Sequence, residues 1–169
     1  DGAVPPSITG RTYADFENNN TGVQTASGAS AFVMNSLIVS TGTFNLNVEG
    51  GGTIRGSVRV KTGAALGFNP ASGTPTYTFA GSAPQQVAIS GTLASTPNAG
   101  FAVNNASGIT LATNWQLAGA LAFANGRITT DANTLILAST GSVSGAAQGT
   151  GWVAGNFRRN FATGASSST

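Results

Sequence analysis

Hydrophobic residues recur along this chain in short alternating runs that are separated by turns. In each run, apolar residues flank one small or polar residue, and a Gly, Asn or Ser turn follows. Strict alternation over a few residues is typical of a half-buried β-strand. The clearest runs are residues 44–48, 58–60, 77–79, 87–89, 101–103, 109–111, 115–117 and 121–123. Because the runs repeat at close intervals, we expect each strand to bury its apolar face against the next copy.

The turn spacing favours a solenoid. One strand of about 3–5 residues and a tight turn fill a typical interval between glycines, and three such strands make a coil of about 20–25 residues. Residues 31–161 would then supply about six coils. No stretch combines a helical period with good helix formers. We therefore predict an all-β fold, a right-handed parallel β-helix of short strands with essentially no helix.

An antiparallel β-sandwich is the alternative fold, but it needs longer strands and regular hairpins. Asn-Gly, a strong hairpin signal, occurs only at Asn125-Gly126. The expected domain organisation is a lead-in segment over residues 1–30 with one strand or a cap, the solenoid over 31–164, and a Ser-rich tail or the start of further sequence over 165–169.

Composition excludes several kinds of chemistry. The 169 residues include no Cys and no His, which removes disulfides, thiolate or imidazole zinc sites and every His-dependent triad. Charged residues make up only 7% of the chain, and the net charge is +2. The cations are too sparse for a nucleic-acid footprint, and no apolar run is long enough for a membrane helix. We expect no nucleic acid, no membrane insertion and no cofactor.

The acidic residues are too few and too scattered to predict catalysis. Asp15 and Glu17 are two residues apart and would share a face of a strand, where a carboxylate pair could bind a cation or a sugar or lie as an exposed polar edge. Glu49 with the cations at 55, 59 and 61 is the candidate group for a polysaccharide lyase, but one acid is too few for a calcium-assisted reaction. We predict no catalytic residue, no metal site and no enzyme.

The candidate contact residues are aromatic and basic. Trp115 and Trp152 could form a sugar-binding platform or belong to the core and its edge. Arg158 and Arg159 form a cationic pair that either contacts a ligand or lies solvated on a strand. Asn105-Ala106-Ser107 also fits the pattern of a glycosylation acceptor.

The order of short sequence motifs in the second half of the chain resembles that of a known group of proteins. A strand with a Gly-Ser turn (77–82) precedes a Gln-Gln-Val strand (85–89), a Phe-Ala-Val segment (101–111) and a segment with Asn-Gly-Arg near its end (115–128). An Asn-Thr-Leu-Ile-Leu run (133–137) and a Gly-Asn-Phe-Arg-Arg segment (155–161) follow. This order resembles the repetitive β-solenoid regions of Bacteroidetes-type surface and secreted proteins exported by the type IX route. The resemblance covers roughly residues 30–164. Family proteins are usually long, with a C-terminal sorting domain, so we expect this chain to be one segment of such a protein.

These observations favour a non-catalytic extracellular protein. We expect a β-solenoid segment of a surface adhesin, stalk or filament that associates end to end or by edge pairing, or that contacts other parts of a larger chain. The resemblance implies a secreted or cell-surface location and carries over no catalytic residue. The alternative is a carbohydrate-binding module of a secreted protein that contacts surface glycans.

Overall fold

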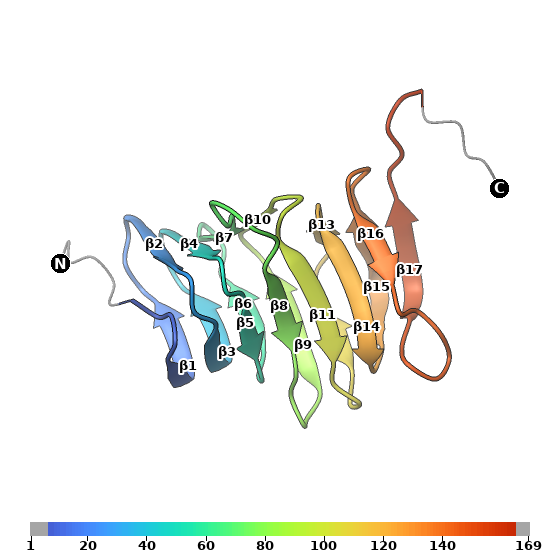
Figure 1. Cartoon of the computed structure of the whole chain (residues 1–169), viewed down its shortest axis with the longest axis horizontal. Coiled ribbons are helices and arrows are strands. Elements are labelled where there is room, and N and C mark those ends of the chain that lie inside the picture. Colours follow the sequence, from blue (N-terminus) through green and yellow to red (C-terminus); the bar gives the residue numbers. More distant parts are fainter. Residues whose placement is uncertain (1–6, 165–169) are drawn as a thin grey trace.

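The alternating runs form strands that pair in parallel with the strands one turn earlier and one turn later. The computed structural model describes residues 7–164, which wind into a β-solenoid of about seven turns (Figure 1). No helix occurs in that part of the chain. The parallel β-helix is therefore confirmed, and the antiparallel sandwich is excluded.

Each turn contributes two or three strands. In chain order they are β1 (Thr12–Asn18), β2 (Val23–Gly28), β3 (Phe32–Val39), β4 (Thr43–Val48), β5 (Gly52–Ile54), β6 (Val58–Val60), β7 (Ala65–Phe68), β8 (Thr76–Phe79), β9 (Gln85–Ile89), β10 (Thr92–Ser95), β11 (Gly100–Asn104), β12 (Ile109–Leu111), β13 (Trp115–Leu117), β14 (Ala120–Asn125), β15 (Ile128–Leu137), β16 (Ser142–Ser144) and β17 (Val153–Arg159). Residues 31–161 hold six turns, as expected. One further turn, built from β1 and β2, lies in the segment where a single strand or a cap was expected. The predicted tail at 165–169 lies outside the described residues.

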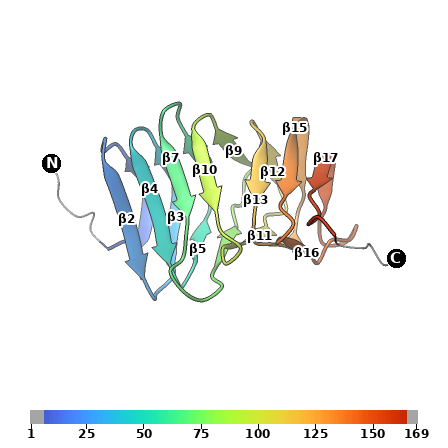
Figure 2. The same ribbon diagram turned by 90° about the horizontal axis from the view of Figure 1, so that it is seen from above.

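The strands line three faces. The first face carries β5, β8, β11, β14 and β16, and the second carries β6, β9 and β12. The third face begins with β2, β4, β7 and β10 (Figure 2). Four strands are shared between faces. Each of them bends at a corner and pairs on both sides of it: β1, β3, β15 and β17.

The core fills the space between the three faces. Inward positions stack from turn to turn, as in the column Leu37, Val58, Val87 and Leu111, each at most 1% exposed. An aromatic stack runs beside it, with Phe68, Tyr77, Phe101 and Trp115 in contact at ring-centroid distances of 4.8 to 5.3 Å. Edge-to-face ring pairs of this kind contribute about 0.5–1.5 kcal/mol beyond the area they bury.

Buried amides hold one corner of the solenoid. Gln85 is 2% exposed, and its Nε2 donates to the carbonyls of Ile54 and Gly56 at 3.0 and 2.6 Å. Its Oε1 accepts from Asn105 Nδ2 at 3.0 Å and from the Gly81 amide at 3.0 Å. These bonds link three successive turns, so the corner that carries the loops after β8, β11 and β14 is rigidly placed.

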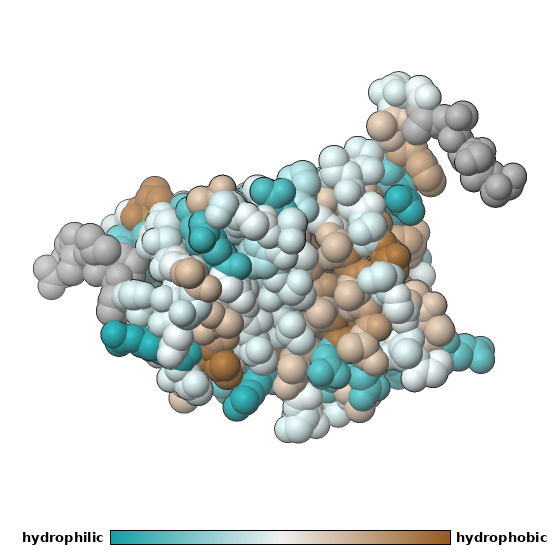
Figure 3. Space-filling view, viewed as in Figure 1, coloured by the Kyte–Doolittle hydropathy of each residue, from teal (hydrophilic) through white to brown (hydrophobic). Residues whose placement is uncertain are grey.

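The two ends of the solenoid differ from its middle. The end strands pair on one side only: β1 with β3, β2 with β4, β16 with β14 and β17 with β15. Among the described residues, the large hydrophobic side chains that are exposed are Val23 in the first turn and Val143, Trp152, Phe157 and Phe161 in or after the last. Figure 3, in the view of Figure 1, shows hydrophobic residues gathered over the C-terminal turns.

Candidate functional site

The four predicted contact residues occupy three different environments. Trp115 is 2% exposed and packs between Phe79 and Phe101, so the idea that it forms a ligand platform is corrected: its indole belongs to the core. Trp152 is 41% exposed and lies at the corner before β17. Arg158 and Arg159 lie within β17 and do not line the pocket that contains Trp152.

The pair of arginines lies on the free edge of the last turn. Arg159 pairs in register with the inward residue Leu137, and its guanidinium lies 5.6 Å from the centroid of the Phe161 ring. It also donates to the Gly141 carbonyl at 3.3 Å. Arg158 is exposed and pairs with Ile136 on the outer side of the same strand. Both arginines are exposed, but neither joins Trp152 in one pocket.

The acidic residues are engaged in local contacts. Hydrogen bonding to Ser36, and then to Asn35, lowers the pKa of the Asp15 carboxyl below its usual value. Glu17 accepts from Ser40 and lies 3.8 Å from the Lys61 ammonium.

The proposed lyase group does not assemble. Glu49 follows β4 and accepts a hydrogen bond from Ser72 at 2.7 Å, whereas Lys61 follows β6 at a different corner. Asn105 is no glycosylation acceptor in the folded chain, because its amide is 1% exposed and donates to three oxygens.

A pocket forms where loops from three successive turns stack at one corner. The loop after β11, the loop after β14 and the long loop before β17 lie over one another. The backbone register is tight: Ile109 N donates to the Arg127 carbonyl at 2.9 Å, and Ile128 N donates to the Trp152 carbonyl at 3.0 Å. Arg127 and Trp152 are thus adjacent rungs of one ladder, and each directly precedes an inward-facing residue.

Glycines permit this close stacking. Gly126 has φ +93°, and a Cβ there would lie 1.8 Å from the Asn105 carbonyl oxygen. Gly151 stacks on it in turn, since a Cβ at Gly151 would lie 1.9 Å from the Gly126 carbonyl oxygen. Any larger residue would push the loops apart, so these glycines set the positions of the side chains that follow them.

The long loop holds its own shape. Ala147 and Gly151 form an isolated antiparallel bridge, with amide-to-carbonyl distances of 3.0 and 2.8 Å. The Thr150 hydroxyl donates to the Gly145 carbonyl and turns back into the loop. The loop therefore presents Gln148 and Trp152 from an ordered frame.

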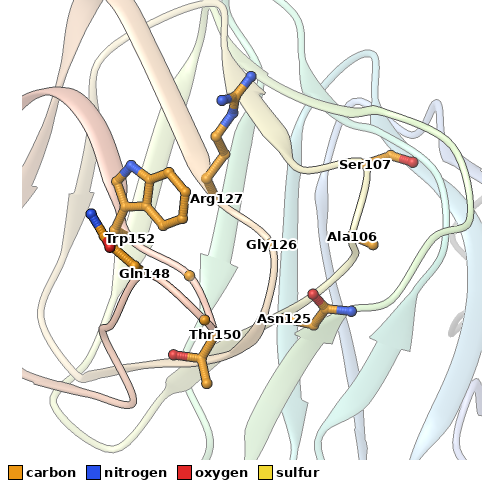
Figure 4. Close-up of a pocket in the computed structure, with 10 residues that line it drawn as sticks. Ala106, Ser107, Asn125, Gly126, Arg127, Gln148, Thr150 and Trp152 are labelled. Atoms are coloured by element: carbon orange, nitrogen blue, oxygen red, sulfur yellow. The ribbon is translucent and has the colours of Figure 1, made fainter.

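The pocket has a volume of about 280 Å³ and a mostly polar lining. Trp152 and Gln148 lie on one side of it, with Asn125 and Ser107 across from them and Arg127 between (Figure 4). Arg127 is the charged residue of the lining, and no acidic residue borders the pocket. A second hollow of about 600 Å³ shares Gln148 and Trp152. We call the two hollows together the Trp152 groove.

Sequence reasoning found Trp152 but missed its neighbours. Asn125, Arg127 and Gln148 come from different lines of the repeat, and only the register of the turns brings them together. In the sequence, Asn125-Gly126-Arg127 lies near the end of the segment over residues 115–128. Aligning it with the residues before β12 and β17 would have placed Arg127 beside Trp152.

Other site types are not evident in the described part of the chain. Within residues 7–164, no group of three or more acidic side chains could hold a metal ion. No helix in that range is long and apolar enough to cross a membrane. No family model matches this chain, and no curated protein and no solved structure matches it either.

Proposed function

We propose that the chain is a non-catalytic structural segment of an extracellular or cell-surface protein, an adhesin, stalk or filament whose solenoid continues head to tail into a second copy. The observation that carries the proposal is the distribution of exposed apolar side chains. Those of the described residues lie in the first turn or in and after the last turn, where the end strands also lack a partner. Unpaired edges with exposed apolar side chains pair readily with another chain.

Charge favours head-to-tail over tail-to-tail contact. The last turn carries Arg158 and Arg159 and no acidic residue, whereas the first turn carries Asp15 and Glu17 with one cation, Arg11. Two last turns facing each other would bring four arginines together. A last turn on a first turn instead sets a basic turn against an acidic one and repeats the parallel pairing of the interior, with Arg158 and Arg159 on the face that begins with β2.

The extracellular location rests on the order of motifs. The lines that resemble type IX-exported solenoid proteins fall on β8, β9, β11, β12, β13, β14, β15 and β17. A charge-poor surface of Ser, Thr, Asn and Gly is consistent with stability that comes from backbone ladders rather than from crosslinks.

Sedimentation velocity across a concentration series tests the association. We expect rod-like oligomers that lengthen with concentration and appear as filaments in negative-stain micrographs. Val143→Lys places a charge at an inward position of the last turn and is expected to abolish them. Gln86→Lys adds the same charge on the outer side of β9 and should leave them intact. A strictly monomeric particle at high concentration would contradict the proposal.

A further inference from the structure

We propose that the Trp152 groove binds an acidic polysaccharide, a chain of pyranose units with carboxylates, which stacks one ring on the indole of Trp152 and pairs one carboxylate with Arg127. This inference does not depend on end-to-end association. It rests on the exposure of the indole, the unused donors around it and the extent of the groove.

The Trp152 indole is accessible for a reason other than the open end of the solenoid. Its neighbour Val153 pairs with the inward residue Ile128, so alternation directs Trp152 outward, as it does the exposed Arg127 one turn earlier. A further turn stacked on the end would cover the inward residues Val143 and Phe157. It would leave the outer face of the corner open, so the exposed ring needs a separate explanation.

The donors around the indole are unused. Among the described residues, the side chains of Asn125, Arg127 and Gln148 make no hydrogen bond, and the Trp152 ring stacks on no other aromatic ring. An indole face packs against the apolar face of a pyranose, while amides bond to hydroxyls as donors and acceptors. A platform with flanking amides therefore suits a sugar.

The charge of the lining selects an acidic sugar. The guanidinium of Arg127 matches a carboxylate in a bidentate geometry, and no acidic side chain in the lining competes for it or repels an anion. Neutral sugars would leave this cation without a partner. The groove also continues past the indole, because both hollows share Gln148 and Trp152, so an occupant can extend to both sides of the ring. That extent favours a polymer over a single sugar.

The frame is formed before any ligand arrives. Gly126 and Gly151 fix the stacking of the loops, and the Ala147–Gly151 bridge fixes the long loop. A preformed site costs little ordering on binding.

Isothermal calorimetry of the full chain with a hexamer of galacturonate, and with the neutral maltohexaose, tests the proposal. We expect binding of the galacturonate hexamer and at least about tenfold weaker binding of the neutral one. Arg127→Gln should weaken galacturonate binding by about 10–100-fold, because it removes a charge-assisted bond. Trp152→Ala should weaken it by at least about fivefold.

Arg158→Gln is the matched control, since it removes an exposed arginine of the last turn that lies outside the groove. It should change the dissociation constant by less than about twofold. Melting curves confirm that each variant is folded. Absence of binding, equal binding of the two hexamers, or equal losses in Arg127→Gln and Arg158→Gln would overturn the proposal.

Discussion

Replacing Gln85 by Leu removes the centre of the buried polar corner. Leucine has a similar volume and keeps the inward position filled, so the change isolates the hydrogen bonds from cavity formation. Four bonds are lost: two that Nε2 donates to Ile54 and Gly56, and two that Oε1 accepts from Gly81 and Asn105.

The expected cost follows from which partners find a replacement. The Ile54 carbonyl keeps the amide of Ala80 at 3.0 Å, and Asn105 keeps the Ala83 carbonyl at 2.8 Å. The Gly56 carbonyl and the Gly81 amide have no other hydrogen bond within residues 7–164. Each polar group left unsatisfied costs about 1–3 kcal/mol. We therefore expect Gln85→Leu to lower the free energy of unfolding by about 2–6 kcal/mol.

Urea unfolding followed by circular dichroism measures this difference. Gln86→Leu is the matched control, because the adjacent Gln lies on the same strand but faces outward and its side chain makes no hydrogen bond to a described residue. It should cost less than about 0.5 kcal/mol. If Gln85→Leu is no more destabilising than Gln86→Leu, the corner is not held by the amide network.

Three further predictions concern stability. Leu111→Ala should lower the free energy of unfolding by about 2–5 kcal/mol in urea titrations, since this 1% exposed side chain would leave a core cavity; a variant as stable as the parent would contradict the core column. Burial raises the pKa of Tyr77 to about 12. The unfolded chain therefore deprotonates first, so the contribution of Tyr77 to stability is fully present below about pH 10 and is lost as pH rises towards 12. Urea titrations between those pH values should show the decline in the parent and a weaker one in Tyr77→Phe. Melting temperature should change little between low and high salt, because the Lys61–Glu17 pair is 61% and 48% exposed and such pairs contribute only about 0–1 kcal/mol; a large salt-dependent shift would refute this.

The fold could be predicted because its signal is local. Alternation within three residues, as in Val58–Val60 and Trp115–Leu117, already determines which side chains point inward. Repetition then predicts the stack. Alternation does not predict strands with a weaker apolar signal. The strands β2 and β10 have few large hydrophobic residues, and they form because they pair with strands of neighbouring turns.

The site could be predicted only in part, because it depends on register. Trp115 alternates with Leu117, a local pattern that already favours an inward side chain, whereas Trp152 directly precedes Val153 and has only Ala154 two positions on. Register then decides what each ring contacts: the rings of Phe79 and Phe101 meet Trp115, and Trp152 lies 41% exposed at a loop corner. The burial of Gln85 and Asn105 could not be predicted for the same reason, since polar residues at a strand end usually face solvent.

Disulfide trapping between copies tests the central claim, head-to-tail continuation of the solenoid, most directly. One outward column of the first face runs through Thr12, Val33, Thr53, Thr78, Ala102, Ala122 and Ser144. A second copy stacked in register would place its Thr12 next after Ser144, at the strand spacing of about 4.8 Å, within the Cα range of a disulfide. The chain has no native Cys, so the assay has no background.

Three kinds of sample are oxidised: each single variant, Thr12→Cys or Ser144→Cys, by itself; a mixture of the two single variants; and a double variant that carries both substitutions in one chain. We predict crosslinked dimers in the mixture, a ladder of oligomers from the double variant, and no dimer from Ser144→Cys alone. Dimers of Ser144→Cys alone, or a double variant that stays monomeric under oxidation, would contradict head-to-tail assembly.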